Sequence, residues 1–231
     1  MFLIIRKNVL AILSIALLGA CAQIDSSELE TSGFYAHYDI TAEPNSLVSC
    51  EADFTAGEGI GATMIELSDG DKVFCSDGTV TKEMKKVAGP VINAINYRAT
   101  GLKYSSTKTY SIIFQRESTD EKLVAKAKVP VPVKVLGPRN GTTVQVGSMV
   151  DVTWTPTAEG EVVIGTNTDN QSSSQNYADS SAGRYSVRVS EPGSDFSIYL
   201  NREFSISMPK GLDGMGYSRS LTSTISLSID E

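Results

Sequence analysis

The chain has 231 residues, with 20 basic side chains, 27 acidic side chains and a net charge of −7 when its single histidine is neutral. This acidic balance argues against nucleic acid as a partner, because phosphate backbones are bound by clusters of Lys and Arg. It also argues against direct binding to anionic lipid headgroups.

The N-terminal segment 1–20 has the parts of a signal peptide. Arg6 and Lys7 precede an apolar run over residues 9–18. At about 1.5 Å per helical residue, this run is too short to span a bilayer core of about 30 Å. The pattern predicts a cleaved segment.

The apolar run ends in Leu18, Gly19, Ala20 and Cys21, which resembles the lipobox of bacterial lipoproteins. In that family the Cys thiol receives a diacylglyceryl group, a peptidase cuts before it, and the new amine is acylated. The resemblance implies a membrane-anchored lipoprotein of the cell envelope, on the outer membrane if the host is Gram-negative. Several acyl chains, at about 0.8 kcal/mol per buried CH₂, make a stable anchor. The alternative is an ordinary signal peptide that happens to contain a Cys.

Cleavage before Cys21 would leave 18 basic against 27 acidic residues, a net charge of −9. Residues 21–32 are polar and lack a sustained periodicity. We therefore expect them to form a lipidated tether between the membrane and the folded part of the chain.

With Cys21 acylated, Cys50 and Cys75 remain as an even pair in an oxidising compartment. This predicts a disulfide between them, with two buried free thiols as the alternative. A metal site is not expected, because His37 is the only histidine and no CxxC pair exists. No cofactor is predicted.

From residue 33 onward, short β-rich runs alternate with turn residues, which is typical of an all-β fold. A first domain is expected over residues 33–130. Its predicted strands are 34–40, 47–54, 64–67, 72–75, 96–100, 109–116 and 123–129. The only helical stretch predicted is 81–87.

Two prolines, Pro130 and Pro132, predict a stiff connection and a domain boundary. A second domain is expected over residues 131–231, so the chain would hold two tandem β-sandwiches. Its predicted strands are 142–146, 149–154, 161–165, 184–189, 196–202 and 218–229.

Residues 140–156 carry an Asn-Gly-Thr turn and then Met149 to Pro156 (MVDVTWTP). This segment resembles the opening of fibronectin type III and related immunoglobulin-like modules, where a Trp on an early strand fills the core. The resemblance implies an immunoglobulin-like second domain, with Trp154 in its core rather than on a ligand-stacking surface.

The sequence contains few motifs that are typical of catalytic sites. His37 lies in an alternating strand, which favours a structural role, and the sequence has no GxSxG or HExxH. Residues 57–61 are glycine-rich but lack the GxGxxG spacing, which predicts a mobile loop. Three aspartates near a predicted hairpin are interpreted as turn residues rather than as a Ca²⁺ site: Asp69, Asp71 and Asp77.

The longest polar stretch, residues 169–183, has no strand signal, and long loops in compact domains are often functional. Tyr177 and Asp179 in this stretch are therefore the predicted contact residues of the second domain. The favoured function is a non-enzymatic module that binds an envelope protein or glycan. The alternatives are a glycan or peptidoglycan hydrolase with a carboxylate pair, and a structural spacer of a surface machine.

The anchor can be tested directly. Cys21→Ser is expected to leave the protein soluble and unprocessed, because the acyl acceptor is gone. Cell fractionation and mass spectrometry of the N-terminus measure this. Retention of the variant in the membrane fraction would contradict lipidation.

Overall fold

The computed structural model describes residues 23–59, 62–68, 70–88, 94–157, 160–168, 171–189, 196–221 and 224–230. Strands dominate, so the all-β prediction is confirmed. The predicted signal peptide and lipobox lie outside the described residues. Among the residues that are described, no helix is long and apolar enough to cross a membrane.

Two short 3-10 helices, η1 (Ser26–Glu28) and η2 (Thr31–Gly33), follow the first strand. The strands up to residue 128 are β1 (Gln23–Asp25), β2 (Phe34–Ala42), β3 (Leu47–Ala56), β4 (Thr63–Glu66), β5 (Lys72–Ser76), β6 (Thr81–Glu83), β7 (Lys85–Ala88), β8 (Ile95–Lys103), β9 (Thr109–Arg116) and β10 (Glu121–Lys128). The later strands are β11 (Val135–Gly137), β12 (Thr142–Gln145), β13 (Met149–Trp154), β14 (Glu161–Thr168), β15 (Gln171–Ala178), β16 (Arg184–Arg188), β17 (Phe196–Ser205), β18 (Asp213–Leu221) and β19 (Ile225–Asp230).

The first sandwich packs β2, β3 and β8 against the four-stranded sheet β10-β9-β5-β6. Strict alternation along β2 turns every second side chain into the core. The predicted disulfide is confirmed: Cys50 on β3 is bonded to Cys75 on β5, with 6.0 Å between their Cα atoms. It therefore joins the two facing sheets. Closing this loop stabilises the fold by about 3.5 kcal/mol in the chain-entropy estimate.

The second sandwich packs β14, β17 and β19 against the three-stranded sheet β11-β13-β16. Trp154, at the end of β13, is 1% exposed and lies among the aliphatic side chains of both sheets. The prediction that Trp154 belongs to the core is confirmed. Among the described residues, the structure thus has two separate hydrophobic cores.

The sequence-based predictions of the helix 81–87 and of the strand 218–229 were wrong. The predicted helix 81–87 is instead the strand pair β6 and β7, because β6 pairs with β5 and β7 pairs with β8. The predicted strand 218–229 is two strands, since β18 pairs with β2 and β17, whereas β19 pairs with β17 and β12. In both cases pairing with distant strands overrides local propensity.

The two sandwiches are interleaved in sequence. We expected all residues after 130 to form the second domain, but Ile206 and Leu212 are buried in the first core. Strand β18 runs parallel to β2 over eight residue pairs. The chain therefore leaves the first sandwich, builds most of the second, returns, and ends in the second with β19.

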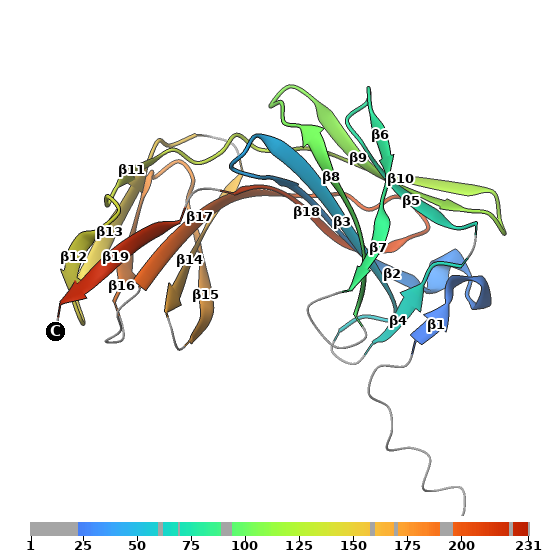
Figure 1. The fold of residues 1–231 in the computed structure, drawn as a ribbon, viewed down its shortest axis with the longest axis horizontal. Coiled ribbons are helices and arrows are strands. Elements are labelled where there is room, and N and C mark those ends of the chain that lie inside the picture. Colours follow the sequence, from blue (N-terminus) through green and yellow to red (C-terminus); the bar gives the residue numbers. More distant parts are fainter. Residues whose placement is uncertain are drawn as a thin grey trace, which may run out of the picture.

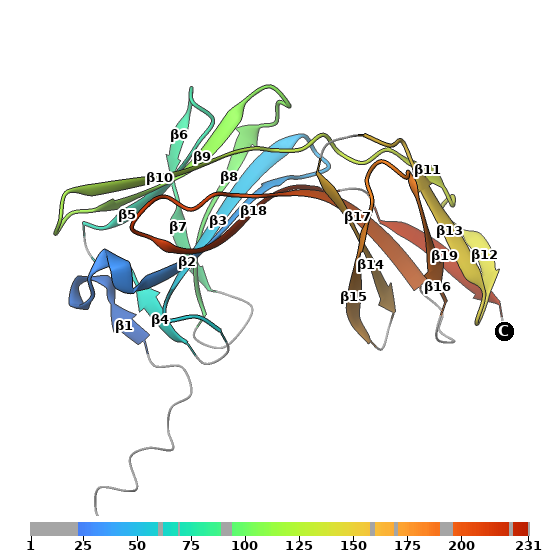
Figure 2. The ribbon, with the colours of Figure 1, turned by 180° about the vertical axis from the view of Figure 1, so that it is seen from behind.

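Over the described ranges, strands β17 and β18 join the two sandwiches into one continuous sheet of twelve strands. The molecule is an arch, with this sheet along its inside and the two smaller sheets outside (Figures 1 and 2).

Buried polar side chains fix the connecting segment between β10 and β11 to this sheet. Arg202, 1% exposed, donates from Nη1 to the Val131 carbonyl at 2.9 Å. The Ser218 hydroxyl donates to the Lys128 carbonyl at 2.8 Å. Buried backbone carbonyls need such partners, so the joint is specified by hydrogen bonds as well as by strand pairing.

Candidate functional site

A charged row crosses the inside of the arch. Strands β15, β14, β17, β18 and β2 are neighbours in that order. Their register places Glu161 of β14 opposite Glu203 of β17, and Glu203 opposite Arg219 of β18. Because alternate residues of these strands enter the cores, this row faces away from them.

A pocket of about 500 Å³ opens on the row. Two carboxylates and three aromatic rings dominate its lining: Gly160, Glu161, Tyr177, Glu203, Phe204, Ser205 and Tyr217. Tyr177 is 62% exposed. Gly160 has a φ of +73°, and a Cβ at this position would lie 2.9 Å from the Phe204 ring. Glycine therefore allows the turn before β14 to pack against that ring.

The charges of the row do not cancel. Arg219 pairs with Asp39 of β2 at 2.5 Å and with Glu203 at 3.7 Å. Glu161 is exposed and forms no salt bridge within the described part of the chain. Among the described residues of this row, one guanidinium thus faces three carboxylates, which leaves the pocket negative.

Burial raises the pKa of the Glu203 carboxyl above its ordinary value. Arg219 opposes this rise, while Asp39 and Glu161 add to it. Like charges directly opposite each other on neighbouring strands are destabilising. The row therefore holds negative charge at a cost in stability, which is typical of a site kept for binding or catalysis.

His37 lies on the same face of β2, between two carboxylates. Its Nδ1 is 3.3 Å from Oδ2 of Asp53, and its Nε2 is 3.9 Å from Oδ2 of Asp39. The hydrogen bond with Asp53 raises the pKa of His37, burial opposes the rise, and Asp39 reinforces it. The imidazole ring centroid is 6.4 Å from that of Tyr217. His37 therefore extends the polar face beyond the pocket.

The pocket has the chemistry of a cation-binding site. Carboxylates attract a cation, and aromatic faces add a cation–π attraction of about 0.5–2 kcal/mol. The same contact already occurs within the chain, where the Arg219 guanidinium lies 5.9 Å from the Tyr217 ring centroid. A second cationic group could use Tyr177, Glu161 and Glu203 in the same way.

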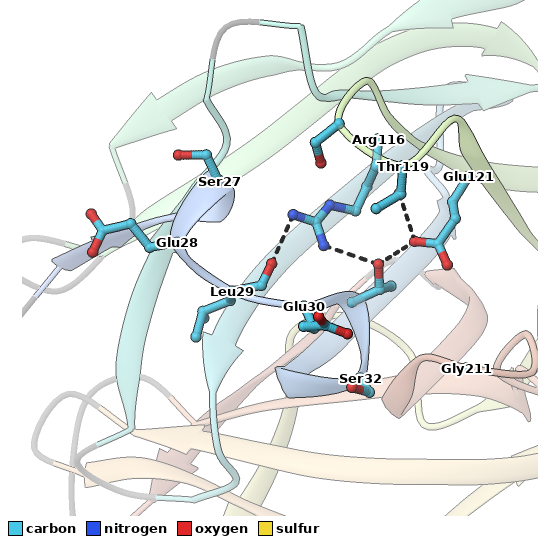
Figure 3. A pocket seen from close by; sticks show the side chains of 11 residues that line it. Ser27, Glu28, Leu29, Glu30, Ser32, Arg116, Thr119, Glu121 and Gly211 are labelled. Carbon is cyan, nitrogen blue, oxygen red and sulfur yellow. Dashed lines mark hydrogen bonds between the residues drawn. The ribbon is translucent and has the colours of Figure 1, made fainter.

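Another pocket, of about 490 Å³, surrounds η1 and η2 (Figure 3). Arg116 at its base is 3% exposed and donates from Nη2 to the Ser26 and Leu29 carbonyls and from Nη1 to Thr31 Oγ1. Its Nε lies 3.6 Å from Asp71 Oδ2. These polar groups are used within the chain, so this arginine fixes the N-terminal segment to the first sandwich.

The described aspartates of the predicted turn cluster have structural partners. Asp71 pairs with Arg116 and accepts a hydrogen bond from the Ser26 hydroxyl. Asp77 accepts from the Val80 backbone N–H at 2.7 Å and pairs with Lys108. Asp69 lies outside the described residues. Over the described ranges, no group of three or more His, Cys, Asp or Glu is placed to hold a metal ion.

The predicted contact stretch 169–183 is in part a strand. Residues 171–178 form β15, because pairing with β14 overrides their polar composition. Tyr177 lies on this strand and lines the pocket, while Asp179 follows it and accepts a hydrogen bond from the Ser181 backbone N–H at 2.8 Å. Leu18, Gly19, Ala20 and Cys21 lie outside the described residues, as do two residues of the predicted loop 57–61.

Sequence reasoning missed the residues that give the pocket its charge: Asp39, Glu161, Glu203 and Arg219. Each lies on a strand, and alternation alone indicates that they face away from a core. Their proximity depends on the pairing of β18 with β2 and β17, which no local pattern reveals.

No family model matches the chain. No curated protein matches it either. Among solved structures, the titin domains Z1Z2 in complex with telethonin are 13% identical, with a TM-score of 0.26 over 87% of this chain and 98% of that chain. An I-band fragment of titin is 8% identical, with a TM-score of 0.23 over 85% of this chain and 64% of that chain. This likeness is too weak to carry a function to the present chain.

Burial of the ionised Glu203 carboxylate destabilises the fold, so the neutral variant Glu203→Gln should change the stability. The folded-state pKa of Glu203 lies above its ordinary value of 4.5. Protonation thus favours folding: this stabilisation is fully present below pH 4.5 and is lost as the pH rises through the folded-state pKa. Because glutamine stays neutral, the variant is expected to unfold at a higher temperature than the parent at pH 7, but not below pH 4.5.

Thermal unfolding at both pH values measures this difference. Glu83→Gln is the matched control, since a hydrogen bond from Lys85 lowers the pKa of Glu83 and the effect at pH 7 should have the opposite sign. A lower melting temperature for Glu203→Gln at pH 7 would show that its ion pair with Arg219 outweighs the cost of burial.

Proposed function

We propose that this protein is a non-enzymatic, lipid-anchored module of the cell envelope that binds a cationic group of a protein or glycan on the inside of its arch. The observation that supports this most strongly is the pocket between β15 and β18. There Glu161 and Glu203 lie opposite each other beside Tyr177 and Tyr217, with a single guanidinium to balance them. A cation from a partner would relieve this excess negative charge.

Two structural features suit such a module to work at a membrane. The continuous sheet and the hydrogen bonds to residues 128–131 hold both sandwiches in one orientation. Arg116 holds the segment that would lead to the anchor against the first sandwich. With Cys21 acylated, as the sequence predicts, the inside of the arch would keep a restricted orientation toward the bilayer.

Site-specific photo-crosslinking in the native envelope tests the binding surface. A benzoylphenylalanine in place of Tyr177 is expected to give a discrete higher-mass adduct. Met149, on the outer sheet and 60% exposed, is the matched control and should give none. Equal adducts at both positions, or an adduct only at Met149, would contradict binding on the inside of the arch. The absence of adducts at both would favour a structural spacer.

A hydrolase that uses a carboxylate pair is the second candidate. It is favoured by the raised pKa of Glu203 opposite Glu161, because glycosidases need one protonated and one ionised carboxyl group. In that case the wild-type protein should release reducing ends from purified peptidoglycan, and Glu203→Gln should lower the rate by at least about a hundredfold. No release by the wild type would exclude peptidoglycan as a substrate.

A further inference from the structure

Strand β15 is a free edge of the large sheet. Within the described residues it pairs only with β14, on one side. Its outer side therefore presents backbone N–H and C=O groups that no described strand satisfies. Such an edge can accept a further strand from another chain.

The other edges of the described sheets are short or charged. Strands β1, β6, β7, β11 and β12 have three or four residues each, and β16 has five with an arginine at each end. The eight-residue edge β10 contains one glutamate and three lysines. Proteins use short length and charge in this way to prevent strand addition.

Strand β15 has neither kind of protection. It is eight residues long, and its sequence, QSSSQNYA, contains no charged residue and no proline. Among the described edges, this is the long strand best suited to pair with a partner.

The edge and the pocket are adjacent. Tyr177 belongs to β15 and lines the pocket, and it pairs with Val163 of β14, two residues after Glu161. A strand added to β15 would extend the same sheet, about 4.8 Å further out. Alternate side chains of that strand would face the inside of the arch beside Tyr177, about 9.6 Å (two strand spacings) from the backbone of Glu161 on β14. Glu203 on β17 lies one spacing further away, beyond the reach of an Arg or Lys side chain.

We infer that β15 receives an extended segment of a partner protein, which adds to the sheet as a further strand and places an Arg or Lys side chain beside Tyr177 and toward Glu161. This inference rests on the proposed function and specifies its partner as a peptide segment. Backbone pairing would supply affinity, and the basic side chain would fix the register. The net charge of −7 favours a basic partner over a second copy of this chain.

The probe is a library of random linear peptides displayed on phage and selected on the full-length, purified protein. Selected sequences are expected to share one Arg or Lys flanked by alternating β-branched residues. Their affinity should fall about tenfold or more for Glu161→Gln and for Tyr177→Ala, and should be unchanged for the control Glu83→Gln. Selected peptides without a basic residue, or with unchanged affinity for Glu161→Gln, would overturn the role of the pocket.

A pair of N-methylated peptides tests strand addition without altering the protein. An added strand uses the N–H groups of only one of its edges, so methylation of alternate residues should abolish binding in one peptide and spare it in the other. If both peptides bind equally while Glu161→Gln still weakens their binding, the pocket is the binding site but strand addition is wrong. If the protein itself dimerises through β15, as seen by loss of dimer with Asn176→Pro, the partner is a second copy and the inference is wrong.

Discussion

The parallel pairing of β2 with β18 is the constraint on which the architecture depends. Eight residue pairs connect a strand near the start of the described chain with one near its end. The approach is close: a Cβ on Gly214 would lie 1.9 Å from the Ala36 carbonyl oxygen. Since β18 also pairs with β17, this contact merges the sheets of two sandwiches into one, and it brings Asp39 beside Arg219 and Glu203.

The joint between the sandwiches differs from a flexible linker. Pro130 and Pro132 limit the backbone there. Side chains of β17, of β18 and of Tyr104, which follows β8, donate to the carbonyls of residues 128, 130 and 131. Inter-domain interfaces within a chain are commonly small and mobile. Here a shared sheet replaces the interface, so the curvature of the arch is part of the fold and the pocket keeps its shape.

Much of the local structure could be predicted from the sequence. Alternation identified most strands, the even pair Cys50 and Cys75 predicted the disulfide, and the position of Trp154 predicted a core residue. The helix predicted over residues 81–87 was wrong, because short polar segments take the structure of the strands beside them.

Less of the candidate functional site could be predicted from the sequence. Tyr177 was singled out as a contact residue, although for a loop rather than a strand. Glu161 and Glu203 could not be selected among 27 acidic residues, because their proximity arises from the antiparallel register of β14 and β17. The alternation of residues along a strand predicts which face of the sheet a side chain is on. Which side chains meet in a pocket depends on the order of the strands in the sheet, which alternation does not reveal.

The return of β18 to β2 also determines when the fold can form. The first sandwich lacks one of its central strands until residues 213–221 have been synthesised. Contacts so distant in sequence form slowly. Until then β2 has an unpaired edge, and such edges expose a chain to aggregation. This topology therefore implies a period of vulnerability before β18 pairs with β2, during which a chaperone that covers this edge would be of most use.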